Sequence, residues 1–249
     1  MSPQTHLLRP AFTEKIAQRL RTGRSVLLIG TEGQGGQRLL EDLALLSEEE
    51  QEVFQLRMEP VGSHKALLEL ICEQLKMEEQ PSIEDALKQL PSKSWLLISD
   101  PVQAIERLVE QQAVDSDFYQ MIRKANNARV AFFTEGFANR SALNLKGYQE
   151  MRLPPLSYTR IKQELERSLP RIGDHSLLTN EVYRHVRPYQ LLNFLKKELR
   201  HLKEPPSAAR LLELRKQFDE SQQLDTPERK VQMPWWKRLF SGWSKKKTQ

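Results

Sequence analysis

The sequence has few of the features that form disulfides, metal sites or membrane spans. Its single cysteine, Cys72, excludes a disulfide framework and suggests a reducing compartment, and its apolar helical surroundings predict a core position. The five histidines have no paired spacing with cysteine or acidic residues, so no metal site is expected. The apolar runs are far shorter than the ~18 residues of a membrane span, and the first residues lack a signal-peptide pattern. These absences predict a cytoplasmic protein.

Charge is unevenly distributed along the chain. The formal net charge is +5, but residues 229–249 contain seven basic residues and no acidic one. Without these seven, 31 of the 38 lysines and arginines remain against 33 acidic residues, which leaves residues 1–228 at −2. Because this part is nearly neutral, any contact with a polyanion is expected first at the C-terminus.

Short apolar runs alternate with helical patterns, which predicts an α/β fold with a parallel sheet of about five strands flanked by helices. The expected strands are residues 26–29, 53–58, 95–99, 130–134 and 151–153. Apolar residues repeat at spacings of three and four in residues 38–46, 63–75 and 118–125, where we expect helices.

Only helical patterns follow residue 153. The expected helices are residues 158–169, residues 181–186 with Asn180 as their cap, a helix opened by Pro188 and continuing to residue 202, and residues 208–218. We therefore expect a P-loop NTPase-like core over residues 1–153 and a small helical lid subdomain over residues 154–204. Residues 205–249 would form a helix, a linker and an amphipathic tail.

A glycine-rich segment joins the first expected strand to the first expected helix. Gly30, four further residues and Gly35 have the spacing of the phosphate-binding loop G-x-x-x-x-G-K-[ST]. In that motif the lysine reaches the β- and γ-phosphates and the hydroxyl holds Mg²⁺. Here Gly36 and Gln37 stand at those two positions.

Two interpretations of this loop remain open. The glycines could serve only a tight strand-to-helix turn. Alternatively, a glycine-rich backbone at a helix N-terminus can direct N–H groups at a phosphate without a lysine, although Glu32 opposes this with a negative charge. The candidate nucleotide-binding residues of the loop are Gly30, Thr31, Gly33, Gly35, Gly36 and Gln37.

The order of these elements resembles the ATPase module of the AAA+ and STAND families over residues 8–202. The segment ending at Asp100 is similar to a Walker B strand with its metal-directed aspartate, but Pro101 replaces the catalytic carboxylate that normally follows. The strand ending at Thr134 is similar to the sensor strand of these families. Pro188 resembles the lid proline that lies against a bound base, although Val186 replaces the glycine of that motif.

Asp100 and three arginines each have two interpretations. Asp100 could be a Mg²⁺ ligand, or its carboxylate could accept hydrogen bonds from backbone donors at the end of the strand, with Pro101 closing the turn. Arg140, Arg160 and Arg187 could approach a phosphate, or they could be solvated residues at helix ends.

The resemblance implies a degenerate ATPase module that senses nucleotide or acts as an assembly or regulatory component. ATP or ADP would bind weakly, and Mg²⁺ binding is doubtful. Hydrolysis is not expected because the lysine, the hydroxyl and the Walker B glutamate are missing, so no catalytic residue is assigned. Two alternatives remain open: an active ATPase with an atypical loop, and a nucleotide-free interaction scaffold.

The C-terminal segment combines aromatic and basic residues. With Pro234 opening a helix, its apolar residues fall on one face at spacings of three and four, in a helix too short to be stable alone. It would dock on a protein partner or on an anionic membrane surface, with packing on its own domain ranked next. Single-stranded nucleic acid ranks last because the rest of the chain is nearly neutral. A homo-oligomer is also compatible with the resemblance. The docking residues are Trp235, Trp236, Lys237, Arg238, Leu239, Phe240, Trp243, Lys245, Lys246 and Lys247.

Overall fold

The computed structural model describes residues 7–47, 51–100, 103–125, 129–137, 140–202 and 204–224. The chain divides into two compact units, residues 1–205 and residues 206–249. The docking residues named above for the C-terminal tail, and Pro101, lie outside the described residues. Among the described helices, none is long and apolar enough to cross a bilayer.

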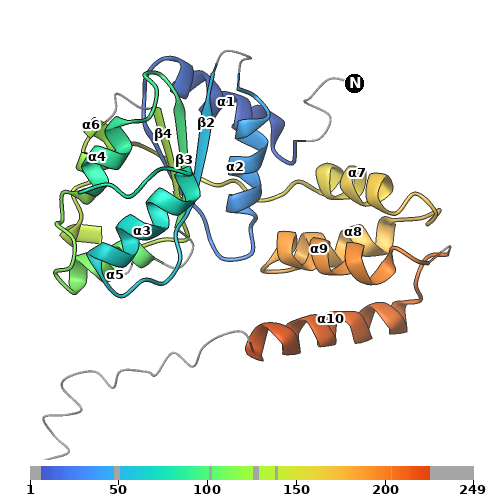
Figure 1. Ribbon diagram of the computed structural model, residues 1–249. Coiled ribbons are helices and arrows are strands. Elements are labelled where there is room, and N and C mark those ends of the chain that lie inside the picture. The colour runs from blue at the N-terminus through green and yellow to red at the C-terminus, as the bar shows by residue number, and fades with distance from the viewer. Residues whose placement is uncertain are drawn as a thin grey trace, which may run out of the picture. The chain divides into compact units, whose positions relative to one another are not determined.

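A parallel five-stranded sheet forms the centre of the first unit (Figure 1). Its strand order is β2-β3-β4-β1-β5. The strands are β1 (Val26–Ile29), β2 (Val53–Arg57), β3 (Trp95–Asp100), β4 (Arg129–Thr134) and β5 (Gln149–Arg152). All neighbouring strands pair in parallel, so the predicted sheet is confirmed.

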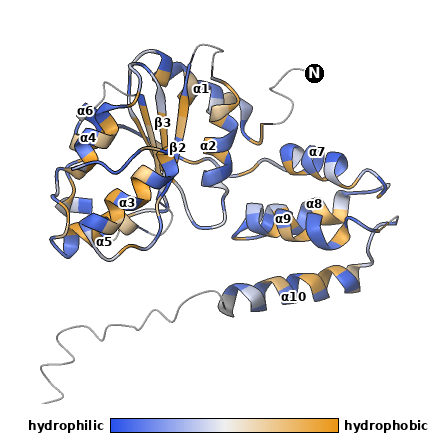
Figure 2. Cartoon of the chain, in the orientation of Figure 1, coloured by the Kyte–Doolittle hydropathy of each residue, from blue (hydrophilic) through white to orange (hydrophobic). Residues whose placement is uncertain are grey.

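Helices cover both faces of the sheet. The helices of this part are α1 (Pro10–Arg21), α2 (Gly36–Ala44), α3 (His64–Leu75), α4 (Ile83–Lys88), α5 (Ala104–Glu110) and α6 (Phe118–Ala125), and a 3-10 turn spans Arg140–Ala142. Serine side chains begin two of them: Ser63 Oγ accepts the amide of Ala66 before α3, and Ser82 Oγ accepts the amide of Asp85 before α4. The helices around the sheet carry both hydrophilic and hydrophobic residues (Figure 2).

Alternate residues of the three central strands β1, β3 and β4 enter different cores, which explains why these strands are nearly continuous apolar runs. Leu27 and Phe132 belong to a core shared with α3 to α6, which also contains the buried Cys72 as predicted. Leu28 and Phe133 belong to a second core that includes residues of α1 and α2. Phe133 therefore lies on the face of the sheet that α2 covers.

Three helices follow β5 and pack on one another. This helical bundle consists of α7 (Tyr158–Ser168), α8 (Ser176–Arg184) and α9 (Pro188–Leu199). Tyr158 and Tyr183 make an edge-to-face contact with ring centroids 5.8 Å apart, and Lys196 Nζ lies 2.6 Å from Glu164 Oε1. These contacts join α7 to both other helices of the bundle.

The largest differences from the predicted helix boundaries are at the start of α8 and at the end of α10. The cap predicted at Asn180 is wrong, because α8 begins at Ser176, whose amide donates to Asp174 Oδ1 at 2.9 Å. In the second unit, α10 (Ala208–Leu224) extends past the predicted end at residue 218. Ser207 Oγ accepts the amide of Arg210 at 3.3 Å and so caps the start of α10.

Candidate functional site

The glycine-rich loop lies at the carboxyl edge of the sheet, between β1 and α2. Thr134 is the register partner of both Ile29 and Asp100, and its carbonyl accepts the amide of Gly30 at 3.0 Å. The structure therefore brings Gly30, Asp100 and Thr134 together at one edge, where ligands of open parallel sheets bind.

The loop itself is a tight turn. Gly33 and Gly35 have φ of 78° and 82°, in the left-handed region that favours glycine. The amide of Gln34 donates to the carbonyl of Thr31 at 3.2 Å, and Gln34 Oε1 accepts the amide of Thr31 at 3.4 Å. Gly36 begins α2, so its amide lies in the first turn, where N–H groups have no intrahelical acceptor.

The ring of Phe133 packs against the underside of this loop. A Cβ atom at Gly36 would overlap Cζ, Cε1 and Cε2 of Phe133, and one at Gly30 would lie 2.9 Å from Cε2. Gly36 stands where the phosphate-binding motif has its lysine, so a side chain at that position would require the ring of Phe133 to shift. Sequence reasoning missed Phe133, since a phenylalanine in an apolar strand does not show which face it occupies.

Asp100 is 1% exposed, and both of its carboxylate oxygens are hydrogen-bonded. Oδ1 accepts the amide of Ala104 at 2.7 Å and Oδ2 accepts the amide of Ile105 at 3.2 Å. Burial raises the pKa of Asp100 to about 6, although these two hydrogen bonds lower it. These are the backbone donors that the second interpretation of Asp100 predicts.

The hydroxyl of Thr134 is also engaged in local structure. Thr134 Oγ1 donates to the carbonyl of Gly136 at 2.8 Å, and the side chain is buried. Thr31 and Gln37 are exposed. Of the three candidate arginines, Arg187 lies at the loop, whereas Arg140 pairs with a residue of β5 and Arg160 donates to a side chain within α7.

Two carboxylates lie close to the loop, and one of them was not predicted. Arg187 Nη2 lies 3.0 Å from Glu32 Oε2. Burial raises the pKa of Glu135 to about 7, the negative charge of Glu32 raises it further, and Arg187 lowers it. Glu135 directly follows Thr134 at the end of β4, and this position was a sign in the sequence that it would lie at the same edge as the loop.

The start of α9 lies directly on the loop. The amide of Tyr189 donates to the carbonyl of Gly33 at 3.0 Å. A Cβ atom at Gly33 would lie 2.7 Å from Cγ of Arg187, and one at Gly35 would lie 2.6 Å from Cγ of Tyr189. Pro188, the predicted lid proline, is buried and is the first residue of α9, between Arg187 and Tyr189 in the sequence.

Arg9 makes a further connection that the sequence did not predict. Its Nη2 donates to the carbonyl of Gln34 at 2.6 Å and its Nε donates to the carbonyl of Pro154 at 2.8 Å. Burial lowers the pKa of Arg9 to about 10, which the nearby Asp42 opposes. Arg9 therefore joins the loop to the segment that leads into the bundle.

The donor set at this edge does not fit a magnesium triphosphate. Phe133 occupies the space beside Gly36, both oxygens of Asp100 are engaged, and Glu32 and Glu135 place negative charge where phosphates would add more. Within the described residues there is no group of three or more His, Cys, Asp or Glu side chains placed to hold a metal ion.

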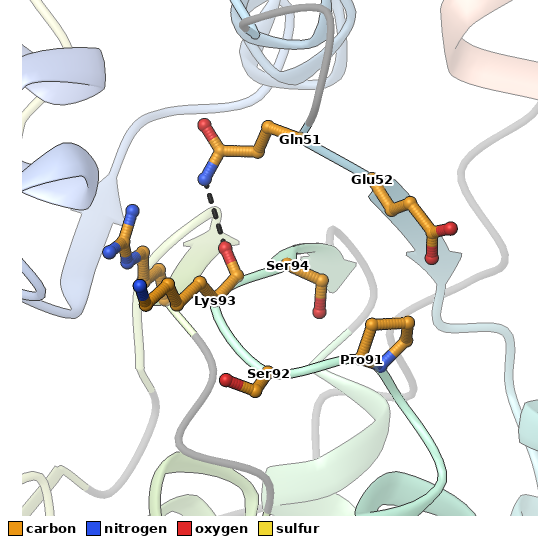
Figure 3. Close-up of a pocket in the computed structure, with 7 residues that line it drawn as sticks. Gln51, Glu52, Pro91, Ser92, Lys93 and Ser94 are labelled. Carbon is orange, nitrogen blue, oxygen red and sulfur yellow. Dashed lines mark hydrogen bonds between the residues drawn. The ribbon is translucent and has the colours of Figure 1, made fainter.

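A polar pocket of about 440 Å³ lies at the opposite edge of the sheet (Figure 3). It is lined by Gln51, Glu52, Pro91, Ser92, Lys93, Ser94 and Arg129, which precede β2 and β3 or begin β4. Gln51 Nε2 donates to the carbonyl of Lys93 at 2.9 Å. Lys93 and Arg129 are basic and Glu52 is acidic, so the lining is of mixed charge, and in Figure 3 the Lys93 and Glu52 side chains extend in opposite directions. The predicted site residues are not among those that line it.

No protein-family model matches the sequence, and no curated protein matches it significantly. Among solved structures the chain is similar to AMPPCP-bound DnaA from Aquifex aeolicus, with a TM-score of 0.53 and 12% sequence identity. The similarity covers 78% of this chain but only 62% of the DnaA chain.

Two structures from Drosophila are also similar to the chain. ORC bound to DNA has a TM-score of 0.42 and 17% identity, over 61% of this chain and 91% of that chain. ORC bound to AT-rich DNA and Cdc6 has a TM-score of 0.42 and 14% identity, over 87% of this chain and 81% of that chain. At these identities the likeness concerns the fold. The parallel five-stranded sheet flanked by helices matches the AAA+ P-loop fold of the DnaA neighbour.

Proposed function

We propose that this chain is an AAA+-like module that does not hydrolyse ATP and acts as an assembly or regulatory component. The observation that carries the proposal is the packing of Phe133 against Gly36. A working loop places a lysine at that position to neutralise the β- and γ-phosphates. In this chain the same space is filled by an aromatic ring, which supplies packing and no charge.

The environment of Asp100 supports the same proposal. A Walker B aspartate acts through its position beside a metal that bridges phosphate oxygens. Here the carboxylate accepts hydrogen bonds from Ala104 and Ile105 at the start of α5, so its role is to fix the end of β3 to that helix.

Weak binding of ATP or ADP is the second candidate function. The left-handed Gly33 and Gly35 and the first-turn amides of α2 support it, because such a backbone can receive an anion. The DnaA neighbour was solved with AMPPCP bound, although that likeness extends only to the fold. The negative charges of Glu32 and Glu135 oppose it. In this case residues 154–204, which contain the bundle, would act as a lid on the nucleotide, with a hinge near Pro154.

Phosphate release from Mg-ATP by the purified full-length protein tests the main proposal. We expect no turnover above that of a heat-denatured sample, and the same rate for Asp100→Ala. Steady turnover that Asp100→Ala abolishes would establish an active ATPase and refute the proposal.

Thermal melting with millimolar Mg-ATP or ADP separates the two candidates. A ligand at a hundred times its dissociation constant stabilises a protein by ~2.7 kcal/mol, which is a measurable shift. No shift supports a nucleotide-free scaffold. A shift that increases in Glu32→Gln, which removes a negative charge from the loop, supports a nucleotide sensor.

The partner surface of this component is proposed to be the C-terminal tail. Its aromatic and basic residues suit a groove on a partner protein or an anionic membrane surface. A homo-oligomer would follow from the first contact if the partner is a second copy of the chain, and a peripheral position at a cytoplasmic membrane would follow from the second.

A further inference from the structure

We infer that the loop between β1 and α2 is a docking surface for the N-terminus of α9, and that this contact forms without nucleotide. The loop would bind the backbone amide of Tyr189 and the guanidinium group of Arg187 in place of a phosphate. It rests on four sets of contacts within the first unit.

The loop caps α9. The first N–H groups of a helix have no intrahelical acceptor, and Arg187, the residue before α9, makes no side-chain capping bond. Pro188 has no N–H, so the first amide that needs a partner belongs to Tyr189. That amide donates to the carbonyl of Gly33 at 3.0 Å. A loop carbonyl therefore performs the role that a capping side chain usually performs.

Glu32 supplies the anion for this end of α9. Its Oε2 lies 3.0 Å from Arg187 Nη2, beside the helix end that attracts negative charge. A loop that held a phosphate would offer that anion to an arginine of the bundle. Here the carboxylate of the loop itself pairs with Arg187, and the pairing requires no ligand.

The glycines of the loop permit this close contact. At Gly33 a Cβ atom would meet Arg187, and at Gly35 it would lie 2.6 Å from Cγ of Tyr189. Gly23 is a matched comparison, because its φ of 79° is nearly that of Gly33 but nothing lies within 4 Å of the place of its Cβ. The loop glycines thus have a second requirement, open space for α9, that Gly23 lacks.

Arg9 connects the same two parts at another point. One side of its guanidinium group donates to the carbonyl of Gln34 in the loop, and Nε donates to the carbonyl of Pro154 before α7. The loop is therefore joined to the entry of the bundle as well as to the start of α9.

Residue-resolved amide hydrogen exchange on the nucleotide-free, full-length protein tests the inference. The amide of Tyr189 is the reporter, because a first-turn amide is protected only by an acceptor outside its helix. We expect it to be protected in the wild type, and Gly33→Ala to accelerate its exchange at least ~10-fold, as local opening would. Gly23→Ala carries the same backbone penalty and should leave the exchange of Tyr189 unchanged.

Two further variants cover the case in which Gly33→Ala does not fold. Glu32→Gln and Arg9→Lys keep the backbone of the loop intact and should each accelerate the exchange of Tyr189 more than that of the amides in β1. Rapid exchange of Tyr189 in the nucleotide-free wild type, or protection that arises only when ADP or ATP is added, would overturn the inference. The inference would also be overturned if Gly23→Ala accelerated the exchange of Tyr189 as much as Gly33→Ala does.

This outcome is separable from that of the proposed function. ATP turnover by the wild type would refute the proposed function, yet it would not alter exchange rates measured without nucleotide. Loss of Tyr189 protection would refute the docking contact, while the absence of turnover would still stand.

Discussion

Phe133 of β4 packs its ring against Gly36, the first residue of α2, at the position where a phosphate-binding loop carries its lysine. The contact belongs to the core that also contains apolar residues of α1 and α2. The apolar core of the sheet therefore extends to the underside of the loop, and a charged side chain at Gly36 would have to displace part of that core.

Restoring the motif should destabilise the protein. Gly36→Lys and Gly36→Ala both place a Cβ atom where it would overlap Cζ of Phe133, and overpacking of this kind costs ~1–3 kcal/mol. Denaturant unfolding measures the loss. Gly62→Ala is the control, because nothing lies within 4 Å of the place of its Cβ.

The effect should depend on the ring. In a Phe133→Leu background, Gly36→Ala should lower the free energy of unfolding by less than in the wild type, because the effects of substitutions at residues in contact are not additive. Equal costs in both backgrounds would contradict the contact. Neither variant at position 36 should gain ATP hydrolysis, since both oxygens of Asp100 remain engaged.

Removal of the Asp100 carboxylate should destabilise the junction between β3 and α5. Asp100→Ala leaves the amides of Ala104 and Ile105 without their buried acceptor, which costs ~1–3 kcal/mol for an unsatisfied buried group. Asp100→Asn keeps one acceptor oxygen and should lose less. Unfolding in urea distinguishes the two variants, and a loss no larger for alanine than for asparagine would argue against the capping role.

Much of the fold could be predicted because its physical cause is visible locally. The central strands β1, β3 and β4 are buried on both faces, so each reads as an apolar run, and parallel strands place Gly30 and Asp100 at one edge of the sheet. The details of the site could not be predicted in this way. The partner of Glu32 is Arg187, 155 residues away, and only the folded chain shows that these two side chains meet.

The two interpretations of Asp100 also could not be separated from sequence alone. They differ in whether its oxygens face the loop or the start of α5, and both directions are open to a residue at the end of a strand. Similarly, the pattern that suggested a cap at Asn180 is local, whereas the true start of α8 depends on Asp174. In both cases a competing hydrogen-bond partner a few residues away determined the structure.

Stability should fall as the pH rises through the titration of Glu135. Its pKa is about 7 in the folded protein against 4.5 as its ordinary value, so the folded state binds more protons between these values. The stabilisation is complete below about pH 4.5 and is lost as the pH passes about 7. Asp100, with a pKa of about 6, contributes in the same direction at lower pH.

Glu135→Gln isolates this contribution. A neutral glutamine should make the protein more stable than the wild type at pH 8, because ionised Glu135 is disfavoured by burial and by the negative charge of Glu32, which Arg187 only partly offsets. At pH 5 the substitution should change the stability little, because Glu135 is then protonated in the folded protein. All other titratable groups are the same in both proteins, so the difference between the two pH profiles reports Glu135. Parallel pH profiles for the two proteins would contradict the prediction.

Deletion of residues 229–249 should abolish docking and leave the fold intact. These residues carry seven basic side chains and no acidic one, and each cation near an anionic bilayer contributes ~1 kcal/mol. Co-sedimentation with phosphatidylserine vesicles should be lost in the truncated protein, while its melting temperature stays close to that of the full chain. A variant with Trp235, Trp236 and Trp243 replaced by serine keeps the charge and tests the aromatic contribution separately. If the truncated protein instead aggregates or melts many degrees lower, the segment packs on its own domain and is not a docking tail.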